Sequence, residues 1–282
     1  MATKDSTPQS RISDDMHVDL AGQMTYGDYL QLKTLFAAKK PLTDKHDEHL
    51  FIIIHHVHEL WLNLMAHELE SAIANIEQDQ LPPAFKSMAR MTRILEQMIR
   101  AWDVLSTMTP SDYLEFRASL GQSSGFQSYQ YRLAEFRLGA KDGKMLLPHR
   151  HDAEIHARLK AAFEAPSLYD AALMLLKRRG FAIPDSVVKR DFSVRHVASD
   201  EVRNAWLEIY RNSKKYFDLY ELAEELVDLE DWFQQWRFRH MKTVERIIGF
   251  KRGTGGSSGV GFLKSALDHY FFPELWAVRT EL

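Results

Sequence analysis

Residues 229–248, LEDWFQQWRFRHMKTVERII, decide the fold of this 282-residue chain. Apolar residues recur here at intervals of three and four, so on a helix they share one face: Leu229, Phe233, Trp236, Val244 and Ile247. His240 lies on the same face. An imidazole in such a wall can bind the iron of a flat macrocycle axially while its apolar neighbours exclude water. The alternative is a hydrogen-bonded core histidine, which is the commoner case.

The sequence becomes rich in glycine directly after this helix, because six of the 13 glycines lie between Gly249 and Gly261. This segment could be a flexible tether. It also carries Lys251, Arg252 and Thr254, which are polar groups on backbone that is free to bend. We therefore expect a loop that closes over a small ligand. No Gly-Lys-Ser/Thr sequence follows the glycines, which excludes a phosphate-binding P-loop.

Composition favours a globular protein that acts on a small molecule. The chain is 45% hydrophobic and 27% charged, and its net charge of -3 provides no basic footprint for nucleic acid or anionic lipid. Its apolar runs are short and its N-terminus is polar, so we expect no membrane span, no signal peptide and a cytoplasmic location. Cysteine is absent, so a bound metal must use His, carboxylate or Tyr ligands.

Nearly all of the chain shows helical periodicity, which predicts an all-α fold. We expect a mobile arm over residues 1–20 and a single helical domain over residues 21–282. The segment 138–151 is the best candidate for a loop or short hairpin, and 180–197 for a peripheral crossover. Helices are predicted over 51–76, 88–105, 111–120, 124–139, 166–179, 199–210 and 215–248.

Three histidines crowd into four residues of the first long helix. His55 shares a helix face with Phe51, whereas His56 points about 100° away, so His55, His56 and His58 cannot act as one cluster. The zinc-protease sequence His-Glu-x-x-His is absent. One interpretation makes His56 and His58 surface or interface residues and His55 a satisfied core residue. The other gives His55 a role in a site.

A further candidate group lies on the short helix predicted over 111–120. Tyr113, Arg117 and Leu120 stand at i, i+4 and i+7, which places a guanidinium on an otherwise aromatic and aliphatic face. The parallel N–H donors of a guanidinium suit the bidentate binding of a ligand carboxylate. Spacing alone cannot separate this from a buried ion pair with an internal Asp or Glu, and the 36 basic residues of the chain favour the ion pair.

Several motifs, taken in order, resemble tryptophan 2,3-dioxygenases over about residues 26–270. They are Tyr26-Gly-Asp-Tyr29-Leu30, Asp47-Glu48, Phe51-Ile-Ile-x-His55, Glu59-Leu-Trp61, Tyr113-x-x-Phe116-Arg117, Ser123-Ser-Gly125-Phe126-Gln127-Ser128, Trp236-Arg-x-x-His240 and Gly253-Thr254-Gly-Gly. The resemblance implies a large helical bundle that encloses haem b, one per subunit, in a homotetramer. It implies the dioxygen-dependent opening of the L-tryptophan indole ring to N-formyl-L-kynurenine, the first step of the kynurenine pathway.

The resemblance also implies a role for each matched residue around the haem. His240 would be the proximal ligand of the iron, supported by Trp102. Ser124 and Gly125 would lie against the distal face. His55 would be the catalytic histidine that hydrogen-bonds the indole N–H. Because the indole N–H is far less acidic than an imidazolium, we expect His55 to orient the indole more than to remove its proton.

The remaining roles concern substrate binding. By resemblance, Phe51, Tyr113 and Leu120 would enclose the indole, Arg117 would hold the carboxylate, and Thr254 would bind the ammonium or carboxylate group. Three further positions would reach into the pocket of a neighbouring subunit: Tyr26, Tyr29 and Leu30.

Three alternatives to this assignment differ in class. A helical-bundle metal oxidase would need Glu-x-x-His pairs on two facing helices, and the chain offers only the shorter Glu-Ile-His at 154–156. A non-catalytic haem carrier would have no use for Arg117 and Thr254. The related indoleamine 2,3-dioxygenases accept broader indoles and are usually monomeric, and both the segment 26–30 and His55 favour the tryptophan enzyme.

Overall fold

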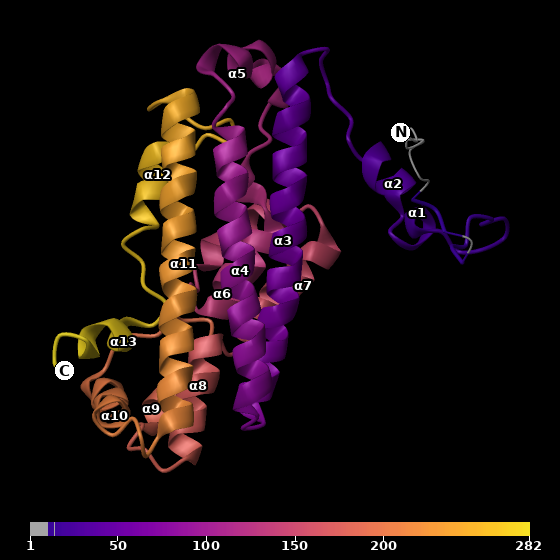
Figure 1. Ribbon diagram of the computed structural model, residues 1–282. Coiled ribbons are helices and arrows are strands. Elements are labelled where there is room, and N and C mark those ends of the chain that lie inside the picture. The colour runs from indigo at the N-terminus through magenta and orange to yellow at the C-terminus, as the bar shows by residue number, and fades with distance from the viewer. Residues whose placement is uncertain (1–10, 14) are drawn as a thin grey trace, which may run out of the picture. The chain divides into compact units, whose positions relative to one another are not determined.

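The structure is a computed structural model that describes residues 11–13 and 15–282. Every regular element in these residues is a helix and none is a strand, which confirms the predicted all-α fold (Figure 1). The chain divides into two compact units, Met1–Pro41 and Leu42–Leu282. The predicted arm, residues 1–20, falls largely on residues outside the described ones, so the predicted boundary at residue 20 stays a prediction.

The second unit is built on three long helices: α3 (His46–Glu77), α4 (Leu81–Leu105) and α11 (Phe217–Ile248). The shorter elements of this unit are α5 (Pro110–Arg117), η1 (Ala118–Leu120), η2 (Gly125–Gln127), α6 (Tyr129–Leu138), η3 (Gly143–His149), α7 (Ala153–Glu164), α8 (Leu168–Arg178), α9 (Asp185–Val188), α10 (Asp200–Arg211), α12 (Val260–Ser265) and α13 (Pro273–Val278). Helix α4 packs between α3 and α11, and α6 and α8 pack against α3 (Figure 1).

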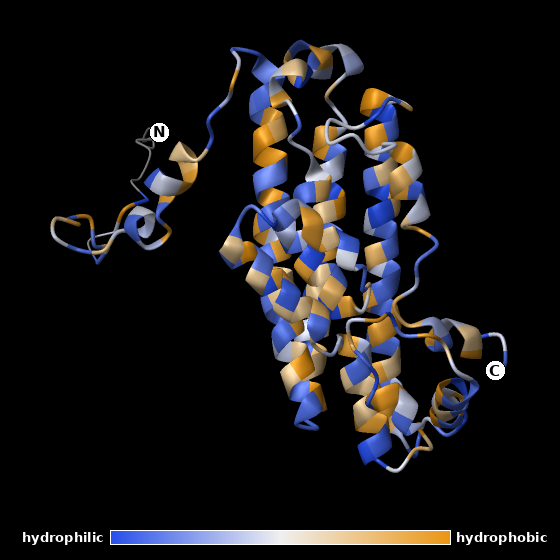
Figure 2. Cartoon of the chain, turned by 180° about the vertical axis from the view of Figure 1, so that it is seen from behind, coloured by the Kyte–Doolittle hydropathy of each residue, from blue (hydrophilic) through white to orange (hydrophobic). Residues whose placement is uncertain are grey.

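The core lies along the contacts of α4 with its two long neighbours. Hydrophobic and hydrophilic residues alternate along these helices (Figure 2), as the helical period of the sequence predicts. Side chains that are fully buried in one hydrophobic cluster include Met65, Leu69, Met88, Met91, Met98 and Phe233. Each such side chain contributes about 1.5–3 kcal/mol relative to leaving it exposed. This seam fixes the positions of the histidine-bearing faces of α3 and α11.

Local capping chemistry explains where several helices begin. Thr109 and Asp112 form the capping box of α5, with Pro110 in its first turn. The predicted helix over 124–139 is instead a 3-10 turn followed by α6. The reason is a second cap, because the Ser128 side chain accepts the N–H of Tyr131 and its own backbone is extended. Segment 138–151, expected as a loop or hairpin, contains η3, which Asp142 caps.

Two buried carboxylates attach the C-terminal helix to the bundle. Glu230 of α11 accepts hydrogen bonds from the backbone N–H groups of Phe271 and Phe272. Glu274 of α13 accepts from the backbone N–H of Ser199 at 3.0 Å and contacts Nε2 of His196 at 2.7 Å. Burying a carboxylate is costly unless it is hydrogen-bonded, and the contacts of Glu274 hold the end of the predicted crossover at 180–197 against α13.

The first unit contains α1 (Tyr26–Tyr29) and α2 (Leu32–Ala37), and a Thr25–Asp28 capping box begins α1. No side chain among residues 11–13 and 15–41 is buried. Its exposed large apolar side chains include Met16, Val18, Leu20, Met24, Tyr26, Tyr29, Leu30 and Phe36. In neither unit is a described helix long and apolar enough to span a bilayer.

Candidate functional site

His240 lies on α11 in an aromatic wall, as its spacing predicts. Its ring stacks on Trp102 of α4 with centroids 4.6 Å apart and planes 6° apart, and on Trp236 at 5.7 Å. Burial, aided by the nearby imidazoles of His58 and His55, lowers the pKa of His240 to about 3. The imidazole is therefore neutral at physiological pH, which is the form that coordinates a metal.

Two indole N–H groups beside this imidazole have no partner. The Nε1 atoms of Trp102 and Trp236 are buried without a hydrogen-bond acceptor. An unsatisfied buried donor costs about 1–3 kcal/mol, and buried Trp N–H groups usually find a partner. A bound group with polar atoms at its edge would satisfy them. A neutral imidazole, flat aromatic neighbours and two free donors together fit an iron porphyrin.

The described residues contain no group of three or more His, Asp or Glu side chains that could hold a metal ion. The bundle-type metal oxidase needs such a group on facing helices. That alternative therefore finds no support in the described part of the chain.

His55 lies on α3, on the other side of α4 from α11, among aromatic side chains. Its Nδ1 lies 2.7 Å from the carbonyl oxygen of Phe51, and the two rings are 4.1 Å apart. Burial lowers the pKa of His55, so its ring is neutral and carries one proton. Since a carbonyl can only accept, Nδ1 carries that proton and Nε2 presents a lone pair. This atom can accept a hydrogen bond from an N–H donor such as that of an indole.

Phe51, Tyr113 and Phe116 form an aromatic cluster beside His55. The ring of Phe51 lies 5.9 Å from that of Tyr113 and 5.5 Å from that of Phe116. Leu120 is partly buried against the same core. Phe116 was not among the predicted site residues, but it stands three residues after Tyr113, and both are buried on one face of α5.

Arg117 lies at a groove of about 390 Å³ together with Thr254. The groove is lined by Leu114, Arg117, Ala118, Gly121, Arg252, Gly253 and Thr254. Nη2 of Arg117 donates to the main-chain carbonyl of Arg252 at 2.6 Å, and its Nε is buried without a partner. The contact observed is thus a carbonyl and not the internal carboxylate of the ion-pair alternative. A guanidinium with an unused buried N–H can receive a ligand carboxylate.

The glycine-rich loop is held against the segment that carries Ser124 and Gly125. The Thr254 hydroxyl donates to the carbonyl of Ser123. A Cβ on Gly255 would lie 2.7 Å from the Cβ of Ser124 and 2.8 Å from Cδ1 of Phe126, so only glycine allows this approach. The loop is therefore packed on the site, in contrast to the tether alternative.

The remaining predicted positions belong to different units of the chain. Trp102 is 4% exposed and belongs to the core. Tyr26, Tyr29 and Leu30 are exposed in the first unit. The interpretation of His58 as a surface or interface residue is wrong, because it is only 4% exposed. The spacing of the sequence could have indicated this, because Ile54, His58 and Leu62 recur every four residues and so share the buried face of α3.

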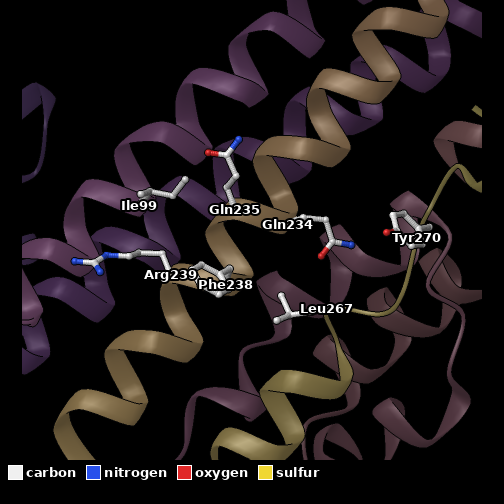
Figure 3. A pocket seen from close by; sticks show the side chains of 7 residues that line it. All are labelled: Ile99, Gln234, Gln235, Phe238, Arg239, Leu267 and Tyr270. Atoms are coloured by element: carbon white, nitrogen blue, oxygen red, sulfur yellow. The ribbon is translucent and has the colours of Figure 1, made fainter. Parts of the chain in front are cut away.

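A larger groove of about 520 Å³ lies on another face of α11. Side chains from α4, from α11 and from the segment between α12 and α13 line it (Figure 3): Ile99, Gln234, Gln235, Phe238, Arg239, Leu267 and Tyr270. Phe238 is two residues from His240 and therefore projects about 200° away around the helix. The groove is separate from the imidazole wall.

Comparison with known proteins identifies a family. The sequence model described as tryptophan 2,3-dioxygenase matches residues 12–282. A tryptophan 2,3-dioxygenase of Bacillus cereus is 57% identical over 267 residues, covering 95% of this chain and 96% of the relative. That of a Polaromonas species is 55% identical, covering 98% and 95%, respectively. That of Bordetella parapertussis is 53% identical and covers 99% of both chains.

Proposed function

Because the chain belongs to the tryptophan 2,3-dioxygenase family and oxidises L-tryptophan to N-formylkynurenine, we propose that it does so with one haem b per subunit, held by His240. The observation that carries this proposal is the neutral imidazole of His240 stacked on Trp102, beside two buried indole N–H groups without acceptors. Haem, when bound and reduced, supplies the activation of dioxygen.

We propose that His55 orients the indole. Its Nδ1–H is engaged by the Phe51 carbonyl, so Nε2 is the atom left to accept the indole N–H. The rings of Phe51 and Tyr113 would pack on the faces and edges of the indole and exclude water. Holding the substrate in one orientation lowers the entropic part of the activation barrier. Ser124 and Gly125 would complete the distal wall.

We propose that the carboxylate of the substrate binds Arg117 and that Thr254 assists at the same groove. The guanidinium offers parallel N–H donors, and the glycine loop lies over this end of the site. Binding would replace the Arg252 carbonyl as the partner of Arg117, or share the guanidinium with it. The clamp favours an amino acid over a plain indole, which separates this function from that of a haem carrier.

A haem-reconstituted, reduced sample should consume dioxygen only when L-tryptophan is present, and N-formylkynurenine should form in equal amount. The carbon monoxide complex of the same sample should change its absorption spectrum on titration with L-tryptophan, because the substrate binds beside the haem. Protein that stays colourless after incubation with hemin would refute the cofactor assignment.

His55→Ala is expected to lower kcat/KM for L-tryptophan by about 10- to 100-fold, or about 1.4–2.7 kcal/mol, because an orienting hydrogen bond is lost. The control substrate is 1-methyl-tryptophan, which differs from L-tryptophan by a methyl group in place of the indole N–H hydrogen and so cannot donate to His55. It should be a poor substrate of the wild type and should lose little further in the variant. An equal loss for both substrates, or a loss as complete as that of a His240 variant, would contradict the orienting role.

The pH profile should also reflect His55. The accepting form is the deprotonated ring, which is present above its folded pKa, and burial lowers that pKa from 6.5. The kcat/KM for L-tryptophan should therefore not change near pH 6.5. It should decline only when the pH approaches the lowered pKa of His55. Initial-rate measurements of kcat/KM between pH 5 and pH 8 test this prediction. An inflection of the profile at or above pH 6.5 would contradict it.

We further propose that the chain forms a homotetramer in which Tyr26, Tyr29 and Leu30 reach a neighbouring subunit's pocket. The support is that the first unit buries none of its described side chains, although it carries many apolar ones. Exposed apolar groups of this kind mark interaction surfaces. Light scattering should give four times the chain mass of 32.8 kDa. Tyr29→Ser together with Leu30→Ser should weaken tryptophan binding while His240 still holds haem.

A further inference from the structure

His58 is a buried polar residue that the proposed mechanism does not use. It lies on α3, three residues after His55, and is 4% exposed. Its Nδ1 lies 2.8 Å from the carbonyl oxygen of Ile54, and its Nε2 lies 3.1 Å from that of Met98. The second contact joins α3 to α4 at the turn that carries Trp102, because in an α-helix the carbonyl of residue 98 accepts the N–H of residue 102.

The ring of His58 is stacked on the indole of Trp102. The two centroids are 3.9 Å apart and the planes are 30° apart. The same indole stacks on His240 at 4.6 Å and 6°. A continuous series of rings thus runs from His58 on α3 through Trp102 on α4 to His240 on α11. The ring of His55, in contrast, meets Trp102 edge-on at a centroid distance of 6.3 Å.

We propose that His58 is a positioning residue for the iron ligand. It fixes the Trp102 indole against the His240 ring, and so sets the orientation in which His240 meets the haem iron. This inference rests on the proposed haem site. Replacing a residue that orients a metal ligand, without itself binding the metal, typically changes metal affinity or activity by 10- to 100-fold.

The geometry indicates that the ring stack is the main contact. Burial lowers the pKa of His58 to about 4, so its neutral ring has one N–H for two carbonyl oxygens. Both carbonyls already accept hydrogen bonds within their own helices, so losing the N–H leaves neither of them unsatisfied. Losing the ring, in contrast, leaves space beside Trp102 and allows the indole to rotate.

Two variants separate the ring from its N–H. His58→Leu removes the aromatic ring, whereas His58→Phe keeps a ring against Trp102 and removes the hydrogen bonds. His67→Leu is the matched control, because His67 is an exposed histidine of the same helix. Each variant is loaded with haem. The iron–histidine stretching band of the reduced protein and the rate of haem transfer to a scavenging globin are then measured, together with the unfolding midpoint.

We expect His58→Leu to shift or broaden the iron–histidine band and to accelerate haem loss about 10-fold or more. His58→Phe should restore the wild-type band and stay within about threefold of the wild-type rate. The inference is overturned if His58→Leu behaves like His67→Leu in both measurements. It is also overturned if His58→Phe shows the same altered band as His58→Leu, since the ring would then make no difference.

The same experiment distinguishes a failure of the haem proposal. Wild-type protein without an iron–histidine band would refute His240 as the ligand, and this inference with it. A normal wild-type band that none of the variants alters would refute only the role of His58. Variants that merely unfold at lower temperature, with an unchanged band, would likewise assign His58 to packing and overturn the inference.

Discussion

Replacement of His240 by Gly is expected to abolish haem retention and to lower tryptophan oxidation by on the order of 1,000-fold or more, equivalent to at least about 4 kcal/mol. The physical reason is that His240 provides the neutral imidazole in the aromatic wall of Trp102 and Trp236. Without that ligand the porphyrin would be held by apolar contacts alone. Absorption spectra after hemin incubation and gel filtration measure the retained haem.

Two comparisons separate this effect from damage to the helix. Glycine in a helix interior costs about 1 kcal/mol relative to alanine, so His240→Ala is measured beside His240→Gly. Added imidazole should restore haem binding in the glycine variant, because it can enter the space left by the side chain. His67→Ala, on the exposed face of α3, should retain full haem content. Variants of His240 that keep both pigment and product formation would refute the proposed ligand.

Replacement of Arg117 by Leu should lower kcat/KM for L-tryptophan by about 100- to 1,000-fold, or about 2.7–4 kcal/mol. Removing one member of a desolvated charge pair costs 2–5 kcal/mol, since the other charge is left unpaired. Arg117→Lys should recover only part of this loss, because an ammonium cannot make the two parallel hydrogen bonds of the guanidinium. The effect should appear chiefly in KM if Arg117 binds the ground state and transition state equally.

Tryptamine, which lacks the carboxylate, is the matched ligand for this test. The wild type should bind tryptamine much more weakly than L-tryptophan, and Arg117→Leu should bind both with similar affinity. Arg93→Leu is the matched control. The side chain of Arg93 is exposed on α4 and does not line the groove, so this variant should behave as the wild type. An Arg117→Leu enzyme that still prefers the carboxylate would show that another group binds it.

Helical periodicity and capping chemistry were enough to predict most of the fold. Thr109, Pro110 and Asp112 carry the complete signal for the start of α5, and the structure has this capping box. The break at Ser128 could not be predicted, because Ser124 and Ser128 both have the chemistry of a cap and their surroundings decide between them. In the same way, η3 contains Gly143 and Pro148, residues that more often indicate a loop.

The site could be predicted only in part. The helical face of His240 follows from spacing, and the structure has the imidazole in that wall. The contacts of Arg117 with Arg252 and of Thr254 with Ser123 join residues more than 130 positions apart. No local pattern in the sequence encodes such pairs. The unpaired N–H groups of Trp102 and Trp236 are likewise visible only once the surrounding atoms are in place.

The close packing of Gly255 has a consequence for engineering this enzyme. A library that randomised the whole 249–261 loop to admit bulkier substrates would mostly yield inactive variants. Any side chain at position 255 would clash with Phe126 and Ser124. Position 259 is equally constrained, since a Cβ there would lie 2.6 Å from the Lys251 carbonyl oxygen. Diversity is better placed at Ser258, which is exposed. Gly255 and Gly259 should therefore be kept in such a library, together with Thr254, which lines the groove proposed for the substrate.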